Sequence, residues 1–326
     1  MKTEILRMLR EADGYISGKE LCNKFGVSRT AVWKAINQLK EAGYEIDAVQ
    51  NKGYILKSAP DIMNQNELKS IMNTSWAGQE LFYFDSIDST NTKAKELAEA
   101  GYPNGTLVVS DSQSAGKGRR GRSWESPSGT GIFMTLMLKP DINPNNASML
   151  TLVAALAVAK AISEITGEKA LIKWPNDIVM NGKKVCGILT EMSAQFDYIN
   201  HIVIGIGINV HNETFPDELK ETASSLMLEC GGRRFRRAEI VEKTMEYFEK
   251  YYEVYLQTED LSALVKEYNA ILVNMQKNVR VLDPKEPFEG KAMGITPKGE
   301  LIVDTWESRK LVSSGEVSVR GIYGYV

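Results

Sequence analysis

The stretch Ile202-Val-Ile-Gly-Ile-Gly-Ile-Asn-Val210 is apolar apart from Asn209 and is interrupted by two glycines. A short uncharged apolar run of this kind predicts a buried strand. Successive side chains of a strand alternate between its faces, so Gly205 and Gly207 leave one face bare. A bare face predicts close approach of a ligand or of another backbone. Asn209 follows on the same face, with an amide that can donate and accept hydrogen bonds.

Strand and helix patterns alternate irregularly around this stretch, between residues 64 and 272. This order predicts an α+β domain built on a mixed sheet. The expected strands are 81–85, 105–111, 131–138, 170–173, 184–192 and 201–210, and the expected helices are 92–100, 147–166 and 238–257. The apolar run 149–159 is too short to span a membrane and predicts a buried helix, so no membrane partner is expected.

The segment 110–124, SDSQSAGKGRRGRSW, combines glycines with four cations in six residues. Backbone amides and guanidinium groups of such a loop can surround a polyphosphate. The spacing does not match a Walker loop. The alternative is a solvated basic loop or a nucleic-acid contact, and the segment alone does not decide between them.

Two shorter polar segments lie at the ends of expected strands. Asp88-Ser-Thr-Asn91 precedes a helix, and taken alone it predicts an N-cap. In Lys173-Trp-Pro-Asn-Asp177, the lysine would end a strand and Asp177 would lie on the turn after it. The segment could therefore place a positive side chain and a metal-binding carboxylate together, although a surface turn often has the same composition.

Residues 1–63 have the order of a winged helix-turn-helix. Helices are expected at about 2–13, 18–25 and 28–42, with Ser28 capping the third, followed by strands at 44–49 and 53–56. The third helix would enter the major groove and the wing would touch phosphates. The candidate DNA contacts are Ser28, Arg29, Thr30, Lys34, Asn37 and Lys52. The alternative is a small helical module that binds protein or packs on the rest of the chain.

The composition limits the kinds of site and partner that can be expected of this chain. The 326 residues carry a net charge of -3, with only three cysteines and two histidines. Residues 1–60 hold 10 Lys plus Arg against 7 Asp plus Glu, whereas the remainder holds 29 against 35, so the two parts are expected to meet different partners. Widely spaced cysteines and a first helix without a signal-peptide core predict a cytoplasmic protein without disulfides or a zinc site.

Together and in this order, the segments resemble the biotin–protein ligases and, with the N-terminal module, the bifunctional ligase–repressors of bacteria. KWPND, the GxGRRG loop followed by Trp124, and GIGINV carry the resemblance, which covers nearly the whole chain. The segments 290–295 (GKAMGI) and 314–320 (SGEVSVR) look like that family's SH3-like C-terminal barrel. The resemblance implies three domains, at 1–63, 64–272 and 273–326.

The resemblance also implies a two-step reaction. The carboxylate of biotin attacks the α-phosphate of ATP, which gives biotinyl-5′-AMP and pyrophosphate. The ε-amine of a lysine on a biotin carrier domain then attacks the mixed anhydride and releases AMP. In this family the adenylate is also the corepressor, so a homodimer and two-fold related operator DNA are expected partners.

Site residues are carried over from the same resemblance. Lys173 and Arg119 take the catalytic roles. The residues expected near biotin are Ser89, Thr90, Asn91, Gln113, Gly116, Lys117, Gly118, Arg119, Lys173 and Gly187. Those expected to hold the adenylate are Lys117, Arg119, Arg122, Trp124 and Asn209, and Asp177 is the candidate Mg²⁺ ligand.

One residue departs from the family pattern. Bacterial relatives commonly carry arginine where this chain has Lys117, and lysine lacks the two-pronged guanidinium. Activity is expected to persist, with weaker retention of the adenylate. The glycine-rich loop is expected to close over the adenylate and exclude water. Two alternatives remain open: a lipoate–protein ligase, and a ligand-sensing repressor without ligase activity.

Overall fold

The computed structural model describes residues 1–283, 286–315, 317–322 and 324–326. Glu316, in the expected motif at 314–320, lies outside the described residues. The chain divides into two compact units. Unit 1 comprises Met1–Asn73 and Arg236–Glu242, and unit 2 comprises Thr74–Phe235 and Lys243–Val326.

Unit 1 is a winged helix-turn-helix, as the sequence predicts. Its elements are α1 (Lys2–Glu11), α2 (Gly18–Phe25), α3 (Arg29–Glu41), the antiparallel hairpin β1 (Glu45–Val49) and β2 (Gly53–Ser58), and α4 (Gln65–Ile71). The turn between α2 and α3 begins at Gly26, whose φ of 63° is left-handed. Ser28 caps α3, because its hydroxyl accepts from the Ala31 amide over 3.2 Å. Helix α4 was not expected, and Asn64 caps it.

Periodicity places one face of α3 in the core of unit 1. Val32, Ala35, Ile36 and Leu39 follow the i, i+3, i+4, i+7 spacing, and all four are buried. They pack in one cluster with buried residues of α1, including Leu6. The opposite face of α3 is therefore left to polar side chains.

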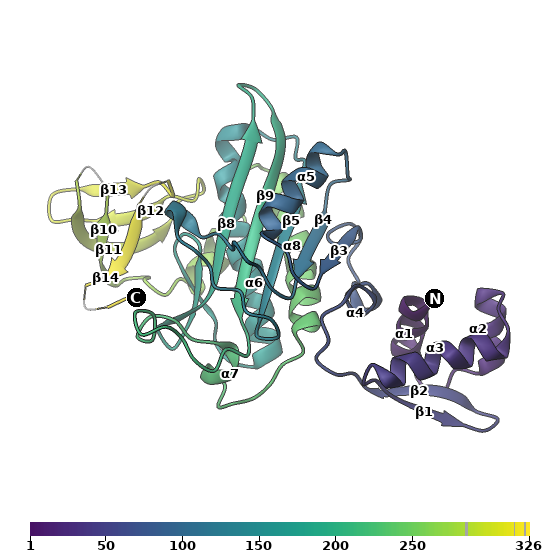
Figure 1. The fold of residues 1–326 in the computed structure, drawn as a ribbon. Coiled ribbons are helices and arrows are strands. Elements are labelled where there is room, and N and C mark those ends of the chain that lie inside the picture. The colour runs from purple at the N-terminus through teal and green to yellow at the C-terminus, as the bar shows by residue number, and fades with distance from the viewer. Residues whose placement is uncertain (284–285, 316, 323) are drawn as a thin grey trace. The chain divides into compact units, whose positions relative to one another are not determined.

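The main sheet of unit 2 has seven strands in the order β3-β4-β5-β9-β8-β7-β6 (Figure 1). The strands are β3 (Leu81–Phe84), β4 (Thr106–Ser110), β5 (Gly131–Leu138), β6 (Leu171–Lys173), β7 (Asp177–Met180), β8 (Lys183–Ala194) and β9 (Ile199–Asn209). Strand β3 is parallel to β4, and the other neighbours are antiparallel. The predicted mixed sheet is confirmed.

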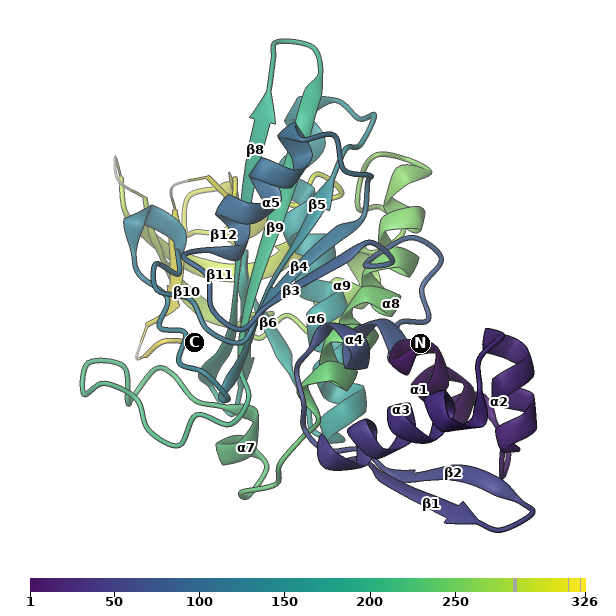
Figure 2. The same cartoon turned by 45° about the vertical axis from the view of Figure 1, so that its right-hand side comes forward.

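Helices cover both faces of this sheet (Figures 1 and 2). Helix α5 (Thr90–Glu99) packs through Ala94 and Leu97 against Val108 of β4 and Val203 of β9. Helix α6 (Leu150–Thr166), the part of α8 (Arg237–Leu256) in this unit, and α9 (Val265–Ala270) lie on the other side. The short helix α7 spans Leu226–Glu229.

Helix α6 is the buried helix that the apolar run predicts. With its preceding 3-10 turn it covers Pro144–Thr166, which is long and apolar enough to cross a membrane by length and composition. However, 72% of the apolar window is buried inside the protein. The apolar character of α6 is therefore explained by its place in the core.

The end of unit 2 is a small all-β region. Its strands are β10 (Asn278–Leu282), β11 (Phe288–Ile295), β12 (Leu301–Asp304), β13 (Arg309–Val312) and β14 (Ser318–Gly321). They form an antiparallel five-stranded sheet in the order β13-β12-β11-β10-β14. This agrees with the all-β C-terminal part that the sequence predicts.

Candidate functional site

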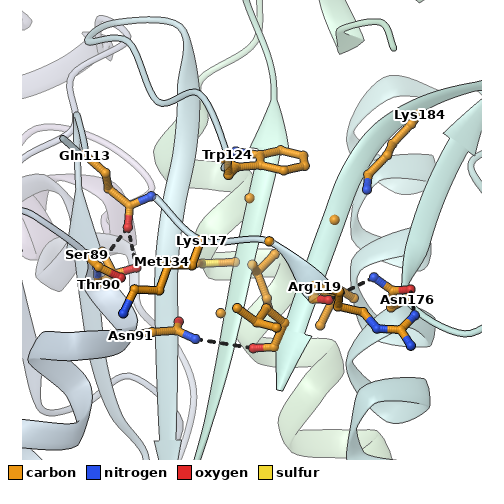
Figure 3. Close-up of a pocket in the computed structure, with 17 residues that line it drawn as sticks. Ser89, Thr90, Asn91, Gln113, Lys117, Arg119, Trp124, Met134, Asn176 and Lys184 are labelled. Carbon is orange, nitrogen blue, oxygen red and sulfur yellow. Dashed lines mark hydrogen bonds between the residues drawn. The ribbon is translucent and has the colours of Figure 1, made fainter. Parts of the chain in front are cut away.

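A pocket lies over the glycine-bearing parts of β8 and β9 (Figure 3). Its lining combines bare backbone, polar side chains and cations from several elements: Ser89, Thr90, Asn91, Gln113, Lys117, Gly118, Arg119, Trp124, Met134, Asn176, Lys184, Gly187, Ile188, Leu189, Gly205, Ile206 and Gly207.

Two glycines on neighbouring strands form the floor under Trp124. Gly187 of β8 and Gly207 of β9 are cross-strand partners. A Cβ at position 207 would lie 2.6 Å from the Trp124 ring, and one at 187 would lie 2.8 Å from it. Real Cβ atoms essentially never come so close, so only glycine fits at both positions with the ring in this place.

Gly205 makes room for a different side chain. A Cβ at this position would lie 2.2 Å from Oδ1 of Asn91. The Asn91 amide instead accepts from the Thr135 hydroxyl over 2.6 Å and donates to Glu191 over 2.7 Å. The expected close approach at Gly205 is thus an approach by the first turn of α5.

Hydroxyl and amide groups line one end of the pocket (Figure 3). The backbone amide and the hydroxyl of Thr90 donate to Oε1 of Gln113 over 2.8 and 3.0 Å. The Gln113 amide nitrogen donates onward to Ser126 over 3.0 Å. Ser89 precedes α5 at the N-cap position, but its side chain makes no capping hydrogen bond. The prediction that this segment serves as an N-cap is therefore wrong for the Ser89 hydroxyl, which lines the pocket.

The glycine-rich segment 116–124 forms a compact loop over the pocket. Its two arms are joined by bonds from the Gly118 amide to the Arg122 carbonyl over 2.7 Å and from the Trp124 amide to the Gly116 carbonyl over 2.9 Å. Lys117 is exposed at the pocket margin. The loop therefore places a cation and the indole on the same pocket.

Arg119 lies at the other end of the pocket from Gln113 (Figure 3). Its guanidinium donates to Oδ1 of Asn176 over 2.7 Å and to the carbonyls of Ser314 and Gly315 over 3.0 and 2.5 Å. Burial lowers the pKa of Arg119 and Asp177 opposes that shift. Because the partners of Arg119 are neutral oxygens, its charge remains available to an anion.

Three charged side chains gather beside Arg119. Asp177 receives the Lys184 ammonium on Oδ1 at 2.6 Å, and the Lys173 ammonium lies 4.0 Å from Oδ2. Burial would raise the pKa of Asp177, but Lys184 and Lys173 hold it below its usual value. Burial lowers the pKa of Lys173 to about 8, although Asp177 opposes this. The cluster carries net positive charge.

Sequence and structure differ on several of these residues. Asp177 begins strand β7 and is not on a turn, because the buried residues Ile178–Met180 continue the sheet. Trp174, in the turn before it, is a buried anchor whose indole donates to the Gly299 carbonyl over 3.0 Å. The expected site residues that do not line the pocket in this conformation are Gly116, Arg122, Lys173, Asp177 and Asn209.

Asn209 shows that the face of a strand does not by itself decide which side chains line the pocket. It lies on the predicted face of β9, but it is buried and its amide donates to the Ser224 carbonyl over 3.1 Å. The unassigned pocket residues include Asn176 and Lys184, which belong to the motif segments KWPND and GKKVCGIL. Both are polar residues close in sequence to an expected site residue, Asn176 to Asp177 and Lys184 to Gly187, and this is the signal by which the sequence could have identified them.

The metal prediction is tested by the donors around Asp177. In the described ranges of the chain, no three His, Cys, Asp or Glu side chains group to hold a metal ion. Both oxygens of Asp177 are already engaged, by Lys184 and by the Tyr325 hydroxyl. A single carboxylate among cations does not form a resident magnesium site by itself, since Mg²⁺ needs further oxygen ligands.

Unit 1 presents the expected DNA-binding residues on its surface. Arg29, Thr30 and Lys34 are exposed along α3, and Asn37 is half-buried on the same helix. Lys52 is exposed at the tip of the β1–β2 wing. Ser28, the remaining candidate, is exposed and caps α3.

Comparisons with known proteins agree with both units. Residues 83–209 match the model of the biotin/lipoate A/B protein ligase family, residues 2–55 match a helix-turn-helix domain, and residues 277–320 match the biotin protein ligase C-terminal domain. The chain is 40% identical over 322 residues to the bifunctional ligase/repressor BirA of Bacillus subtilis, covering 98% of each protein. It is 26% identical to the Escherichia coli protein of the same name, over 93% of this chain and 92% of that protein.

A solved structure has the same fold as much of the chain. The biotin protein ligase of Aquifex aeolicus in complex with biotin and ATP superposes with a TM-score of 0.65 at 30% identity, over 74% of this chain and 99% of that one. The identity to the Bacillus protein over nearly the full length shows the relationship directly. The chain therefore belongs to the family of bifunctional biotin protein ligases and repressors.

Proposed function

We propose that the pocket activates biotin with ATP to biotinyl-5′-AMP and that the chain then transfers biotin to a lysine of a carrier domain. The observation that carries this proposal is the distribution of polar groups in the pocket: hydroxyl and amide groups around Gln113 at one end, with the Lys117 ammonium beside Asn91, and Arg119 and Lys184 at the other end. Biotin, which has a neutral ureido ring at one end and a carboxylate at the other, matches this distribution of polar groups. The Aquifex ligase with the same fold is described in complex with biotin and ATP.

The hydrogen-bonding end would hold the ureido ring of biotin. Ser89, Thr90 and Gln113 offer hydroxyl and amide groups there, and Asn91 is fixed by Thr135 and Glu191 behind them. The Trp124 ring and the Lys184 side chain fill the space over Gly187 in this conformation, so biotin would approach the backbone there only after those side chains move. Gly116 and Gly118 would let the loop pass closely over the ligand.

The cationic end would hold the reacting groups. The biotin carboxylate and the α-phosphate are both anionic, so fixed positive charge must offset their repulsion as the oxygen attacks phosphorus. Arg119 lines this end of the pocket, whereas the Lys117 side chain points toward Asn91 at the other end in this conformation (Figure 3). Lys117 and Arg122 would reach the phosphates when the loop closes. Lys173 lies behind them in the cluster with Asp177 and supplies further charge where pyrophosphate departs.

The adenine would lie against Trp124, whose ring already rests on the glycine floor. Asn209 would support that side of the site through Ser224. Mg²⁺ would arrive with the ATP phosphates, whose oxygens would complete its ligand set, and Asp177, the one carboxylate among the proposed site residues, would be its protein ligand. In the second step the carrier lysine attacks the anhydride carbon, and AMP leaves with the bonding electrons.

Loop 116–124 would close over the adenylate. The hydrogen bonds within the loop would let it move as one piece, and closure would protect the anhydride from water. Protease cleavage within 114–124 should slow when biotin and ATP are added. Unchanged cleavage would remove this part of the proposal.

The same adenylate would act as corepressor for unit 1. It would favour a homodimer in which two winged helices read two halves of an operator, with phosphate contacts from Arg29, Lys34 and Lys52 and base contacts from Thr30 and Asn37. Sedimentation should show more dimer with biotinyl-5′-AMP. A dimer populated equally with and without the adenylate would remove the coupling.

The ligase proposal is tested by ATP–pyrophosphate exchange with biotin, with lipoate and with neither. Exchange should require biotin and fall at least about 100-fold in Lys173→Ala, because the site loses a fixed charge. Lys169→Ala, an exposed lysine on the approach to β6, is the matched control and should remain active. Exchange with lipoate would instead indicate a lipoate ligase, and no exchange with either acid would indicate a ligand-sensing repressor.

A further inference from the structure

The segment Gly324–Val326 contacts the charged cluster of unit 2, although the C-terminal domain model that matches this chain ends at residue 320. Its Tyr325 hydroxyl donates to Oδ2 of Asp177 over 2.6 Å, across 148 residues of sequence. The Lys173 ammonium lies 4.2 Å from the centre of the Tyr325 ring, within the range of a cation–π contact. One tyrosine therefore touches both members of the Lys173–Asp177 pair.

Small residues bring this segment into place. A Cβ at Gly321, the last residue of β14, would lie 2.2 Å from the Val326 carbonyl oxygen. A Cβ at Gly182, in the turn between β7 and β8, would lie 3.3 Å from the Val326 side chain. Glycine at position 321 therefore allows the chain to fold back after β14 and bring Tyr325 to Asp177.

The Tyr325 hydroxyl completes the surroundings of Asp177. Oδ1 of the carboxylate faces Lys184 at 2.6 Å, and Oδ2 is left to Tyr325 at 2.6 Å and Lys173 at 4.0 Å. Burial and the neighbouring carboxylate raise the pKa of Tyr325, so the hydroxyl remains a donor at neutral pH. Without it, the partner of Oδ2 among the described residues would be Lys173 at 4.0 Å, and a buried carboxylate oxygen without a close hydrogen-bond donor is destabilised.

The ring of Tyr325 also limits where Lys173 can go. The lysine is buried, with about 5% of its side chain exposed, and the ring covers its ammonium group. Because the ring holds the charged end of this flexible side chain, Lys173 has fewer accessible rotamers. The ammonium is therefore fixed between the carboxylate and the aromatic face.

We propose that Tyr325 is a positioning residue for adenylate formation, which holds Asp177 through its hydroxyl and Lys173 through its ring. This inference rests on the proposed ligase activity of the same site. Tyr325 is not one of the residues that line the pocket, and it would act through Asp177 and Lys173, which it contacts. Its loss should therefore slow the reaction and leave the binding of biotin unchanged.

The experiment measures kcat and KM for biotin-dependent ATP–pyrophosphate exchange in four variants of the full chain. Tyr325→Ala should lower kcat by roughly 10- to 100-fold, the scale expected when a reacting group is misplaced, with KM for biotin changed less than about twofold. Tyr325→Phe keeps the ring and should recover part of this loss. Gly321→Ala leaves Tyr325 intact but displaces its segment, and should resemble Tyr325→Ala.

The matched control is Trp306→Ala, which removes a fully exposed aromatic side chain from the same C-terminal region and should not change kcat. A second readout is acetylation of Lys173 by acetic anhydride, followed by peptide mass spectrometry. Lys173 should react faster in Tyr325→Ala than in the unaltered chain, since the ring covers it. This readout does not require enzyme activity.

The possible outcomes distinguish the proposed ligase activity from the proposed positioning role of Tyr325. No exchange with biotin in the unaltered chain would reject the ligase proposal, whatever the Tyr325 variants do. Exchange in the unaltered chain with the same kcat in Tyr325→Ala and Gly321→Ala would overturn only the positioning role. Unchanged acetylation of Lys173 would overturn the contact on which that role depends. Loss of the cooperative unfolding transition in Tyr325→Ala would likewise count against the positioning role, because the lower kcat would then reflect misfolding.

Discussion

The indole ring of Trp124 lies directly on the backbone of Gly207, at a distance where a methyl group in place of the glycine hydrogen would come within 2.6 Å of the ring. Gly187, the cross-strand partner of Gly207, leaves the same space on the next strand. The two glycines thus make a flat platform that sets the height of the indole above the sheet. What binds against the other face of Trp124 depends on that height.

Gly207→Ala should push the Trp124 ring away from the sheet and weaken ATP binding. Loss of an aromatic stacking partner costs about 1–3 kcal/mol, which corresponds to roughly 5- to 150-fold in KM for ATP. The measurement is exchange kinetics at saturating biotin. Gly14→Ala, at a glycine with open space around it, is the control and should leave KM unchanged. Equal KM values for both variants would contradict the platform role.

Lys117→Arg should strengthen retention of the adenylate. A guanidinium can form two parallel hydrogen bonds to a phosphate or carboxylate where an ammonium acts as a point charge. We expect biotinyl-5′-AMP to dissociate about 3- to 10-fold more slowly, for a gain near 1 kcal/mol. Stopped-flow dissociation measures this. Arg120→Lys, an exposed residue of the same loop outside the pocket lining, is the control. A dissociation rate that does not fall would refute the expectation.

Glu67→Ala should destabilise unit 1. The Glu67 side chain is fully buried and accepts from Arg10 at 2.8 Å, from Arg236 at 2.5 Å and from the Tyr44 hydroxyl at 2.6 Å. Removing the carboxylate takes the acidic partner from the largely buried Arg10 and one of two acidic partners from Arg236, which also pairs with Glu239. Loss of a buried ion-pair partner costs about 3–5 kcal/mol at most. Thermal unfolding should show a lower first transition. Glu41→Ala, at an exposed position on α3, should leave that transition unchanged.

Glu249→Gln should flatten the pH dependence of stability in unit 2. The Glu249 carboxylate accepts from the backbone amides of Ser75, Trp76 and Ala77 at 2.8, 2.8 and 3.0 Å. Burial opposes the shift, but these bonds hold the pKa below its ordinary value of 4.5. The stabilisation is therefore present above pH 4.5 and is lost as pH falls through the lower folded-state pKa.

The expected difference between the original chain and Glu249→Gln is about 1.5–3 kcal/mol at pH 7, the usual size for hydrogen bonds to a charged group. It should shrink as pH is lowered below about 4. Melting temperatures between pH 7 and pH 3 measure it, with the exposed Glu253→Gln as control. A difference that stays constant across this range would show that the charge of Glu249 does not contribute.

The winged helix and the mixed sheet could be predicted because their signals are local. The spacing of Val32, Ala35, Ile36 and Leu39 identifies one helix face, and the alternation around Gly205 and Gly207 identifies one strand face, without reference to the rest of the chain. The motif segments were likewise visible as unusual local compositions. The pocket draws on motif residues within β8 and β9 and on the loop and the start of α5 beside them.

Other features depend on which distant segments meet. Whether Asp177 begins a strand, whether Asn209 reaches the pocket or bonds to Ser224, and where Tyr325 lies are consequences of sheet order and of the chain's return after β14. Such contacts join residues that are 15 to 196 positions apart. Periodicity specifies the face of an element and not its neighbour, so local sequence could predict the parts of this site, and only the packing of the folded chain decided which of them touch.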